Sequence, residues 1–332
     1  MTMYKMRNFG FYLFFCAWFL IISCGEDEII EPVDVCETNR FTQEVFNGVT
    51  LSENVIYARA VGVTNLEQIL VMDVYEPAQD ADLDKRPLII WVHGGSFFSG
   101  DKTELADLCQ MGAKRGFVTA TTNYRMLNFA NGLPDTTALT DIVIKATRDL
   151  KSAVNFFVDD ARGANKYKID TTKIFVGGVS AGAITALHAT YLDDNDGQPD
   201  FLKKAIANNS GLEPRPSSPA KSRIKAVISL SGAIINTNVL QKEEAPIYSI
   251  HGDADDVVPI QKGFVGGQSL AILEMFGSQS IDTYAKSIGL PSSFIKVPGG
   301  GHVDIYFDAK YASQITQFNT NVYNGLKDFI CQ

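Results

Sequence analysis

Gly178-Val179-Ser180-Ala181-Gly182 is the stretch that decides the fold of this 332-residue chain. It follows the apolar run of residues 174–176 and precedes a helix-forming run at residues 183–188. A strand, a tight turn carrying a serine and a helix are together typical of a nucleophile elbow, where glycines let the strand and helix backbones approach closely. The pattern predicts that Ser180 sits exposed at the end of a buried strand.

The chain around this motif alternates between apolar runs and helical periodicity. Residues 87–92 form a continuous apolar run, which is typical of a strand buried on both faces. Further strands are expected at residues 117–121, 174–176, 226–230, 247–250 and 294–297, and helices at residues 105–115 and 141–158. Residues 50–74 predict short antiparallel strands. The alternation predicts an α/β fold with a mostly parallel, doubly wound sheet and antiparallel N-terminal strands.

Two segments depart from this alternation. Residues 193–220 contain four prolines and the acidic run of residues 193–196, interrupted by Asn195. They predict an excursion above the sheet that forms a small partial cap. Residues 263–290 carry enough helical periodicity for the next crossover helix together with an insertion.

Composition narrows the classes of function. Hydrophobic residues make up 45% of the chain, which fits a globular core, and the net charge of −9 comes from 29 basic and 38 acidic residues. No cluster of Lys or Arg occurs beyond the extreme N-terminus. The composition therefore predicts no nucleic-acid partner and no binding to an anionic membrane surface through a basic patch.

The first residues predict a route out of the cytoplasm. Lys5 and Arg7 precede the uncharged apolar residues 9–22, which fit a secretory signal, and residues 20–25 are similar to a bacterial lipobox. We expect residues 1–24 to be a lipoprotein signal peptide ending at Cys24, the lipidated residue, with a cleaved signal or an uncleaved anchor as alternatives. Residues 25–40 would be an acidic tether and residues 41–332 the catalytic domain, anchored by lipid in the cell envelope.

Three of the five cysteines remain for the folded domain. The cell envelope permits disulfides, and Cys36 and Cys331 lie at the two ends of the domain. Because the termini of compact domains often lie close together, we expect these two to form a disulfide. Cys109 stands among apolar residues and is expected to be a buried free thiol.

A serine nucleophile needs a base oriented by a carboxylate, and both residue types occur in the loops after later strands. His302 directly follows three glycines at residues 299–301 and is the expected general base. Asp253, Asp255 and Asp256 follow the preceding strand, and any of the three could orient the imidazole.

Two of these loops resemble segments of α/β-hydrolases. His251-Gly252-Asp253-Ala254-Asp255-Asp256-Val257-Val258-Pro259 is similar to the family's H-G-x-x-D-x-x-V-P segment. The resemblance implies that Asp255 is the triad acid, with Asp256 second and Asp253 third. The order Ser180, Asp255, His302 is also that of α/β-hydrolases.

His93-Gly94-Gly95-Ser96-Phe97 resembles the HGGG-type oxyanion loop of esterases, with Ser96 at the position of the third glycine. The resemblance implies that the N–H groups of Gly95, Ser96 and Ala181 stabilise the negative charge of the transition state. Phe97 and Phe98 are candidates for the wall of the substrate pocket or for the core.

Residues 72–77, 122–125 and 169–178 extend the resemblance, which covers about residues 50–332, to carboxylesterases and hormone-sensitive-lipase-like enzymes of this superfamily. The chain departs from many hormone-sensitive-lipase relatives in having Val179, not an acidic residue, before the serine. No zinc, phosphate-loop or dinucleotide motif occurs, so we expect no metal and no cofactor.

The resemblance implies a serine hydrolase that cleaves carboxylic esters through an acyl-enzyme. Acylated polysaccharide, feruloyl or acetyl esters, lipids and polyesters are candidate substrates for an enzyme of the cell envelope. Two alternatives stay open: a peptidase of the prolyl-oligopeptidase type, and a non-catalytic α/β-hydrolase that serves as a binding module.

Overall fold

The computed structural model describes residues 34–80, 83–128, 133–194, 197–215, 218–266 and 271–332. Asp34–Gln332 forms one compact unit. The expected signal peptide, Cys24 and residues 25–33 of the expected tether lie outside the described residues. In the part of the chain that is described, no helix is both long enough and apolar enough to cross a membrane.

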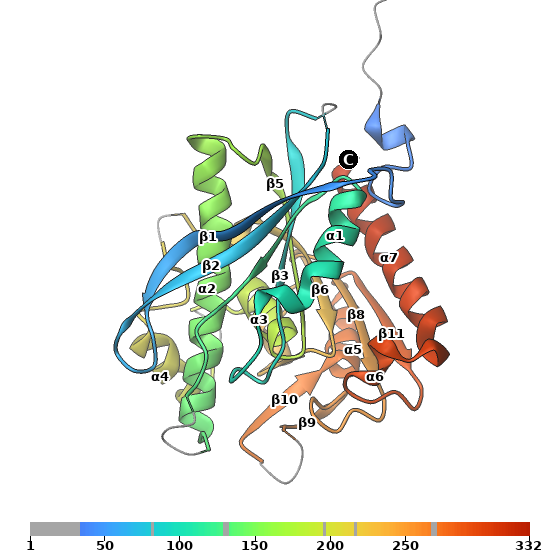
Figure 1. Ribbon diagram of the computed structural model, residues 1–332. Helices are drawn as coiled ribbons and strands as arrows, with labels where there is room; N and C mark the ends of the chain where they lie inside the picture. Colours follow the sequence, from blue (N-terminus) through green and yellow to red (C-terminus); the bar gives the residue numbers. More distant parts are fainter. Residues whose placement is uncertain (1–33, 81–82, 129–132, 195–196, 216–217, 267–270) are drawn as a thin grey trace, which may run out of the picture. The chain divides into compact units, whose positions relative to one another are not determined.

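An eight-stranded sheet forms the centre of the compact unit. Figure 1 shows the sheet with helices packed around it. Its order is β1-β2-β4-β3-β5-β6-β8-β11, in which β1 pairs antiparallel with β2, and β2 antiparallel with β4. All the other neighbours are parallel. The strands are β1 (Val49–Val61), β2 (Glu67–Pro77), β3 (Arg86–Val92), β4 (Val118–Thr122), β5 (Ile169–Val179), β6 (Ile224–Leu230), β8 (Ile247–Gly252) and β11 (Ser292–Val297). The predicted α/β sheet with antiparallel N-terminal strands is confirmed.

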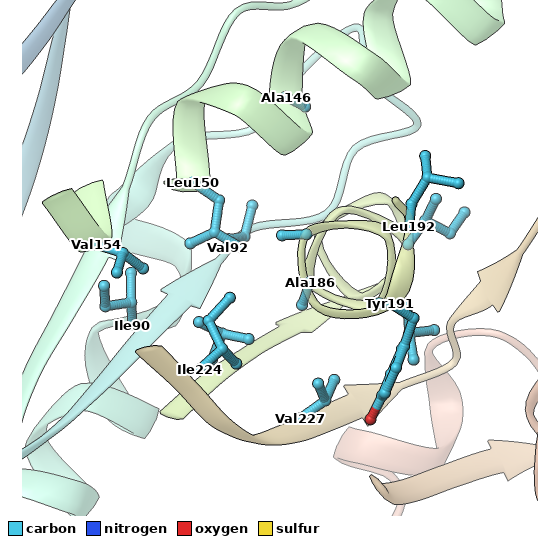
Figure 2. Close-up of a cluster of buried hydrophobic side chains, with 14 of the residues drawn as sticks. Ile90, Val92, Ala146, Leu150, Val154, Ala186, Tyr191, Leu192, Ile224 and Val227 are labelled. Atoms are coloured by element: carbon cyan, nitrogen blue, oxygen red, sulfur yellow. The ribbon is translucent and has the colours of Figure 1, made fainter. Parts of the chain in front are cut away.

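Helices cover both faces of the sheet because its central strands are apolar on both sides. All seven residues of β3 are buried. Ile90 and Val92 pack in the cluster that contains residues of α2 (Thr136–Arg162), α3 (Ala181–Tyr191) and α5 (Ser278–Ile288), part of which Figure 2 shows. Ile89 and Trp91 point to the other face, toward α1 (Ala106–Lys114) and α7 (Ala312–Ile330). Side chains that alternate along β3 thus contribute to two hydrophobic cores, one on each face of the sheet.

A second, three-stranded sheet lies near the C-terminal ends of β6 and β8. It has the order β7-β10-β9 and is antiparallel, with strands β7 (Ala233–Ile234), β9 (Lys262–Val265) and β10 (Leu273–Gly277). Together with α5 it accounts for the crossover helix and insertion expected at residues 263–290.

The segment at residues 193–220 packs beside α2. It contains α4 (Asp200–Asn208), whose Leu202 and Ile206 are buried in the same cluster as α2. Arg148 of α2 donates a hydrogen bond to the carbonyl of Gly211, and Lys151 pairs with Glu213 at 2.7 Å. The structure therefore places the expected partial cap along the side of α2.

The two ends of the unit are joined, as predicted. Cys36 and Cys331 form a disulfide across 295 residues of sequence, and Cys109 is a buried free thiol. Lys327 of α7 also donates to the carbonyl of Thr38. These contacts hold residues 34–40 on the compact unit. The C-terminal part of the expected tether, residues 34–40, therefore belongs to the compact unit.

Candidate active site

Ser180 occupies a sharp turn between β5 and α3. Its backbone has φ 55° and ψ −119°, a left-handed conformation that costs energy for a residue with a side chain. Its N–H donates to the carbonyl of Leu230 at 2.8 Å, which fixes the turn against β6. The side chain is 6% exposed. The expected elbow is present, but the prediction that Ser180 sits exposed is wrong, because the loops that carry Gly94 and His302 lie against it and bury it.

The two glycines of the motif are sterically required at this turn. A Cβ on Gly178 would lie 2.3 Å from the carbonyl carbon of Gly182. A Cβ on Gly182 would lie 1.9 Å from the carbonyl oxygen of Val92 on the neighbouring strand. Since any side chain at these positions would overlap backbone, the elbow depends on glycine at both.

His302 and Asp255 come to Ser180 from the loops after β11 and β8. Nε2 of His302 lies 2.8 Å from Oγ of Ser180, and Nδ1 lies 2.7 Å from Oδ2 of Asp255. Asp253 instead accepts from the N–H of Gly299, and the exposed Asp256 does not contact His302. The structure therefore brings together Ser180, His302 and Asp255, and leaves the two other candidate aspartates outside.

The carboxylate of Asp255 is fully buried and has four hydrogen-bond donors. Oδ1 accepts from the N–H groups of Val257 and Val258, both at 2.9 Å, and Oδ2 accepts from His302 and His251. Burial by itself raises the pKa of Asp255, but these hydrogen bonds and the nearby imidazole outweigh burial and hold the pKa well below its usual range. Asp255 is therefore ionised at neutral pH and can orient His302.

His251 is a contact of Asp255 that the sequence did not predict. It lies at the end of β8, is 0% exposed, and its Nε2 is 3.1 Å from Oδ2 of Asp255. The spacing of four residues between His251 and Asp255 was visible in the sequence, but the turn that folds them together was not.

The predicted oxyanion loop lies directly against the elbow. A Cβ on Gly94 would be 3.4 Å from Cβ of Ser180. The N–H groups of Gly95, Ser96 and Ala181 donate to no protein acceptor within the described residues. The carbonyl of Gly95, by contrast, accepts from the N–H groups of the turn that follows. Gly95 and Ser96 have φ 101° and 53°. These N–H groups are therefore free to bind an oxygen atom of a ligand, and Ser96 keeps its N–H with its side chain exposed.

His93 and Tyr124 hold this loop from behind. Nδ1 of His93 donates to the carbonyl of Gly94 at 2.8 Å, and the ring stacks on Tyr124 with centroids 4.5 Å apart. The hydroxyl of Tyr124 donates to the same carbonyl at 3.2 Å. Burial lowers the pKa of His93, so it is neutral near pH 7 and acts as a structural residue.

Phe97 and Phe98 have different positions. Phe97 is 2% exposed and packs in the core, edge-on to Tyr124. Phe98 lines a surface groove of about 990 Å³, within the size range of ligand sites. The groove follows α2 between the end of β1 and the turn after α4. Phe98, the residue after the oxyanion loop, lines one part of it, whereas Ser180, His302 and the oxyanion donors do not line it. Its lining is rich in charged and amide groups, including Arg59, Arg125, Asp141, Lys145, Arg148 and Asn209.

The described residues contain no cluster of His, Cys, Asp or Glu side chains arranged to hold a metal ion.

An eight-stranded sheet of this topology, with a serine elbow, a histidine and an aspartate after successive strands, defines the α/β-hydrolase class. Within this class, residues 72–236 match the BD-FAE family model. No curated protein sequence matches the chain.

Solved structures with the same fold include esterases of the Planctomycetes species Thermogutta terrifontis. A thermophilic esterase with bound propionate is 17% identical, with a TM-score of 0.59, covering 85% of this chain and 95% of the esterase. Esterase 2 of the same species, phosphorylated by paraoxon, is 19% identical with a TM-score of 0.58, covering 86% and 95%. The expected α/β-hydrolase fold is thus confirmed.

Proposed function

We propose that this α/β-hydrolase is a serine carboxylesterase. The observation that carries the proposal is the chain of contacts from Ser180 through His302 to Asp255, beside three backbone N–H groups with no protein acceptor. These are the nucleophile, base, orienting carboxylate and oxyanion donors that acyl transfer needs.

The reaction follows from this geometry. Oγ of Ser180 attacks the ester carbonyl carbon while Nε2 of His302 takes the hydroxyl proton, and the carbonyl oxygen becomes an oxyanion bound by Gly95, Ser96 and Ala181. The C–O bond to the alcohol then breaks, and His302 returns the proton to the departing alcohol. Water, deprotonated by His302, attacks the acyl-enzyme and releases the acid and Ser180. Asp255 remains ionised and holds Nδ1–H of His302 throughout.

The structural relatives support this chemistry. The Thermogutta terrifontis protein in these structures is named an esterase, and in one of them it is phosphorylated by paraoxon. An organophosphate that phosphorylates such an enzyme reacts with the kind of activated nucleophile that we assign to Ser180.

The groove supports an ester whose alcohol part is large and polar. Phe98, the residue after the oxyanion loop, lines the groove. A lipid or polyester chain lying in it would remove the charged and amide lining from water without offering these groups new hydrogen bonds. Acylated polysaccharide therefore fits better than a lipid or polyester, with a small acyl group such as acetyl or an aromatic one such as feruloyl.

The location of the protein is part of the proposal. A lipobox-like segment ending at Cys24 supports a lipid-anchored enzyme of the cell envelope, where external acylated polymers are accessible. In membrane fractions, Cys24→Ser should release the protein into the soluble fraction, and equal retention of both forms would contradict the anchor.

The activity test compares the purified protein with Ser180→Ala on p-nitrophenyl acetate, butyrate and decanoate. Hydrolysis that vanishes in the variant supports the esterase. A wild-type protein as inert as the variant would overturn it and favour a peptidase or a binding module.

A second variant tests the substrate class. Phe98→Ala should lower kcat/KM on an acetylated oligosaccharide several-fold and leave p-nitrophenyl acetate nearly unaffected, because only the larger alcohol extends into the groove. Equal effects on both substrates would contradict the role of the groove.

A further inference from the structure

The imidazole of His251 contacts the same oxygen atom that orients His302. Oδ2 of Asp255 lies 2.7 Å from Nδ1 of His302 and 3.1 Å from Nε2 of His251. His302 reaches the surface, with 12% of its side chain exposed, whereas His251 is enclosed on the interior side of the carboxylate. The reaction proposed above uses only the first of these two imidazoles.

The contacts of His251 fix which nitrogen carries a proton. Nε2 lies 3.1 Å from Oδ2 of Asp255 and also 3.1 Å from the carbonyl oxygen of Val258, and neither oxygen can donate. Nε2 therefore carries hydrogen and donates to both. Nδ1 lies 2.9 Å from Oγ of Ser278, whose single hydroxyl hydrogen can be donated either to Nδ1 or to the carbonyl of Gly232.

These contacts connect Asp255 to α5. Ser278 is the first residue of α5, is fully buried, and lies 3.4 Å from the carbonyl of Gly232. The N–H groups of Val257 and Val258 hold only Oδ1 of Asp255. Without His251, Oδ2 would be held, among the described residues, by His302 alone.

We propose that His251 is a positioning residue for catalysis, which fixes Oδ2 of Asp255 from the protein interior so that the carboxylate stays aligned with Nδ1 of His302. The proposal rests on the serine hydrolase mechanism, because it assigns His251 a role through Asp255. His251 touches neither the substrate nor Ser180.

The other titratable groups around this pair come from α6, from β11 and from the loop after β8. Tyr306 of α6 (Asp304–Phe307) donates to or accepts from Ser231, and burial raises its pKa, so its hydroxyl is uncharged. Lys296 of β11 is the register partner of His251, and its ammonium lies 3.4 Å from Asp253. The charges in contact with Oδ2 are therefore limited, among the described residues, to Asp255 itself and the imidazolium that His302 forms during the reaction.

Two amide variants separate positioning from packing. The amide nitrogen of His251→Gln lies where Nε2 was and can donate to Asp255, whereas that of His251→Asn lies nearer Nδ1 and can reach only Ser278. We expect kcat of His251→Asn to fall about tenfold to a hundredfold with little change in KM, since a hydrogen bond to a charged group is lost. His251→Gln should recover most of kcat.

The pH profile is the second readout. Without the donor, Oδ2 carries more negative charge and stabilises the imidazolium of His302, so the acid limb of kcat/KM should move to higher pH in His251→Asn. His188→Gln is the matched control, because His188 is also fully buried and hydrogen-bonded but has no contact with the triad. It should leave the acid limb in place.

Phosphorylation of Ser180 by paraoxon, followed over pH by release of p-nitrophenol, gives the same profile without an ester substrate. A wild-type protein that neither cleaves esters nor reacts with paraoxon contradicts the proposed function itself. A reactive wild type whose folded His251→Asn variant keeps its kcat and its acid limb overturns only the role of His251. If His251→Asn does not fold, His251→Leu, which fills the same buried space without a donor to Oδ2, decides by the same two readouts.

Discussion

The two ends of the parallel strands are built in opposite ways. At the N-terminal end, bonds join elements that are distant in sequence: Arg86 at the start of β3 binds Glu76 at 2.6 Å, Lys173 of β5 donates to the carbonyl of Ile330, and Cys36 is bonded to Cys331. At the C-terminal end, Ser180 has a left-handed backbone, and N–H groups beside it have no protein acceptor.

This difference separates stability from function along one sheet. Strain and unpaired donors cost free energy, and they persist only where the surrounding structure holds them in place. Cross-links at the opposite end can supply that support without entering the site. Changes at the C-terminal end should therefore alter rates, and changes at the N-terminal end should alter the free energy of unfolding.

The largest effect is expected for Asp255→Asn. The amide cannot hold Nδ1–H of His302 in the same way, so kcat should fall on the order of 10³- to 10⁴-fold, as for other triads of this type. Asp256→Asn is the control, because its side chain is exposed and does not contact His302. Steady-state hydrolysis of a p-nitrophenyl ester measures both. A larger loss with Asp256→Asn would transfer the triad role to that residue.

A smaller effect, on unfolding, is expected for Cys36→Ser. Removing a disulfide that closes a long loop should lower the free energy of unfolding by about 2–5 kcal/mol. The kcat of the folded variant should stay at the wild-type value, because the bond lies at the end opposite Ser180. Urea unfolding and ester hydrolysis on the same sample check both parts. A loss of kcat in fully folded protein would show that the two ends are coupled.

The smallest effect concerns pH and a residue at neither end. His188 of α3 donates from Nδ1 to Ile184 and accepts at Nε2 from the N–H of Ile235, and burial lowers its pKa to about 4. The unfolded chain therefore binds more protons than the folded chain between about pH 6.5 and 4. The free energy of unfolding decreases as the pH is lowered through this window, by up to about 3 kcal/mol for this residue. His93 acts in the same direction.

Urea midpoints between pH 7.5 and 4.5 test this. His188→Gln should have a flatter dependence than the wild type, whereas its kcat at pH 7.5 should be unchanged. Parallel curves for the two proteins would assign the pH dependence to other groups.

The elements of the main sheet could be predicted from sequence because each of them is decided locally. Residues 87–92 were expected to form a buried strand, and β3 spans Arg86–Val92. The small antiparallel sheet could not be predicted in the same way, since β7 pairs with β10 some forty residues later and spans only Ala233–Ile234. Short strands with distant partners leave no periodicity in the sequence.

The residues of the site also differ in whether the sequence alone could identify them. Ser180 and His302 stand in glycine-flanked loops that a motif can identify. The choice among three neighbouring aspartates depends on the turn at residues 253–258, and the contact of His251 with Asp255 depends on how that turn folds back over β8. The position of residues 193–220 beside α2 depends on tertiary pairs such as Lys151 with Glu213, which proline and acidic residues in that segment do not encode.

The disulfide also bears on the proposed lipid anchor, because it lies where the compact unit begins. Cys36 lies two residues after Asp34, where the compact unit begins, and it is fixed at the end of the sheet that lies away from Ser180. An attachment through the residues before Asp34 would therefore pull on the cross-linked end. The catalytic end of the strands, with the mouth of the site, would be left free to meet a bulky polymer from the opposite direction.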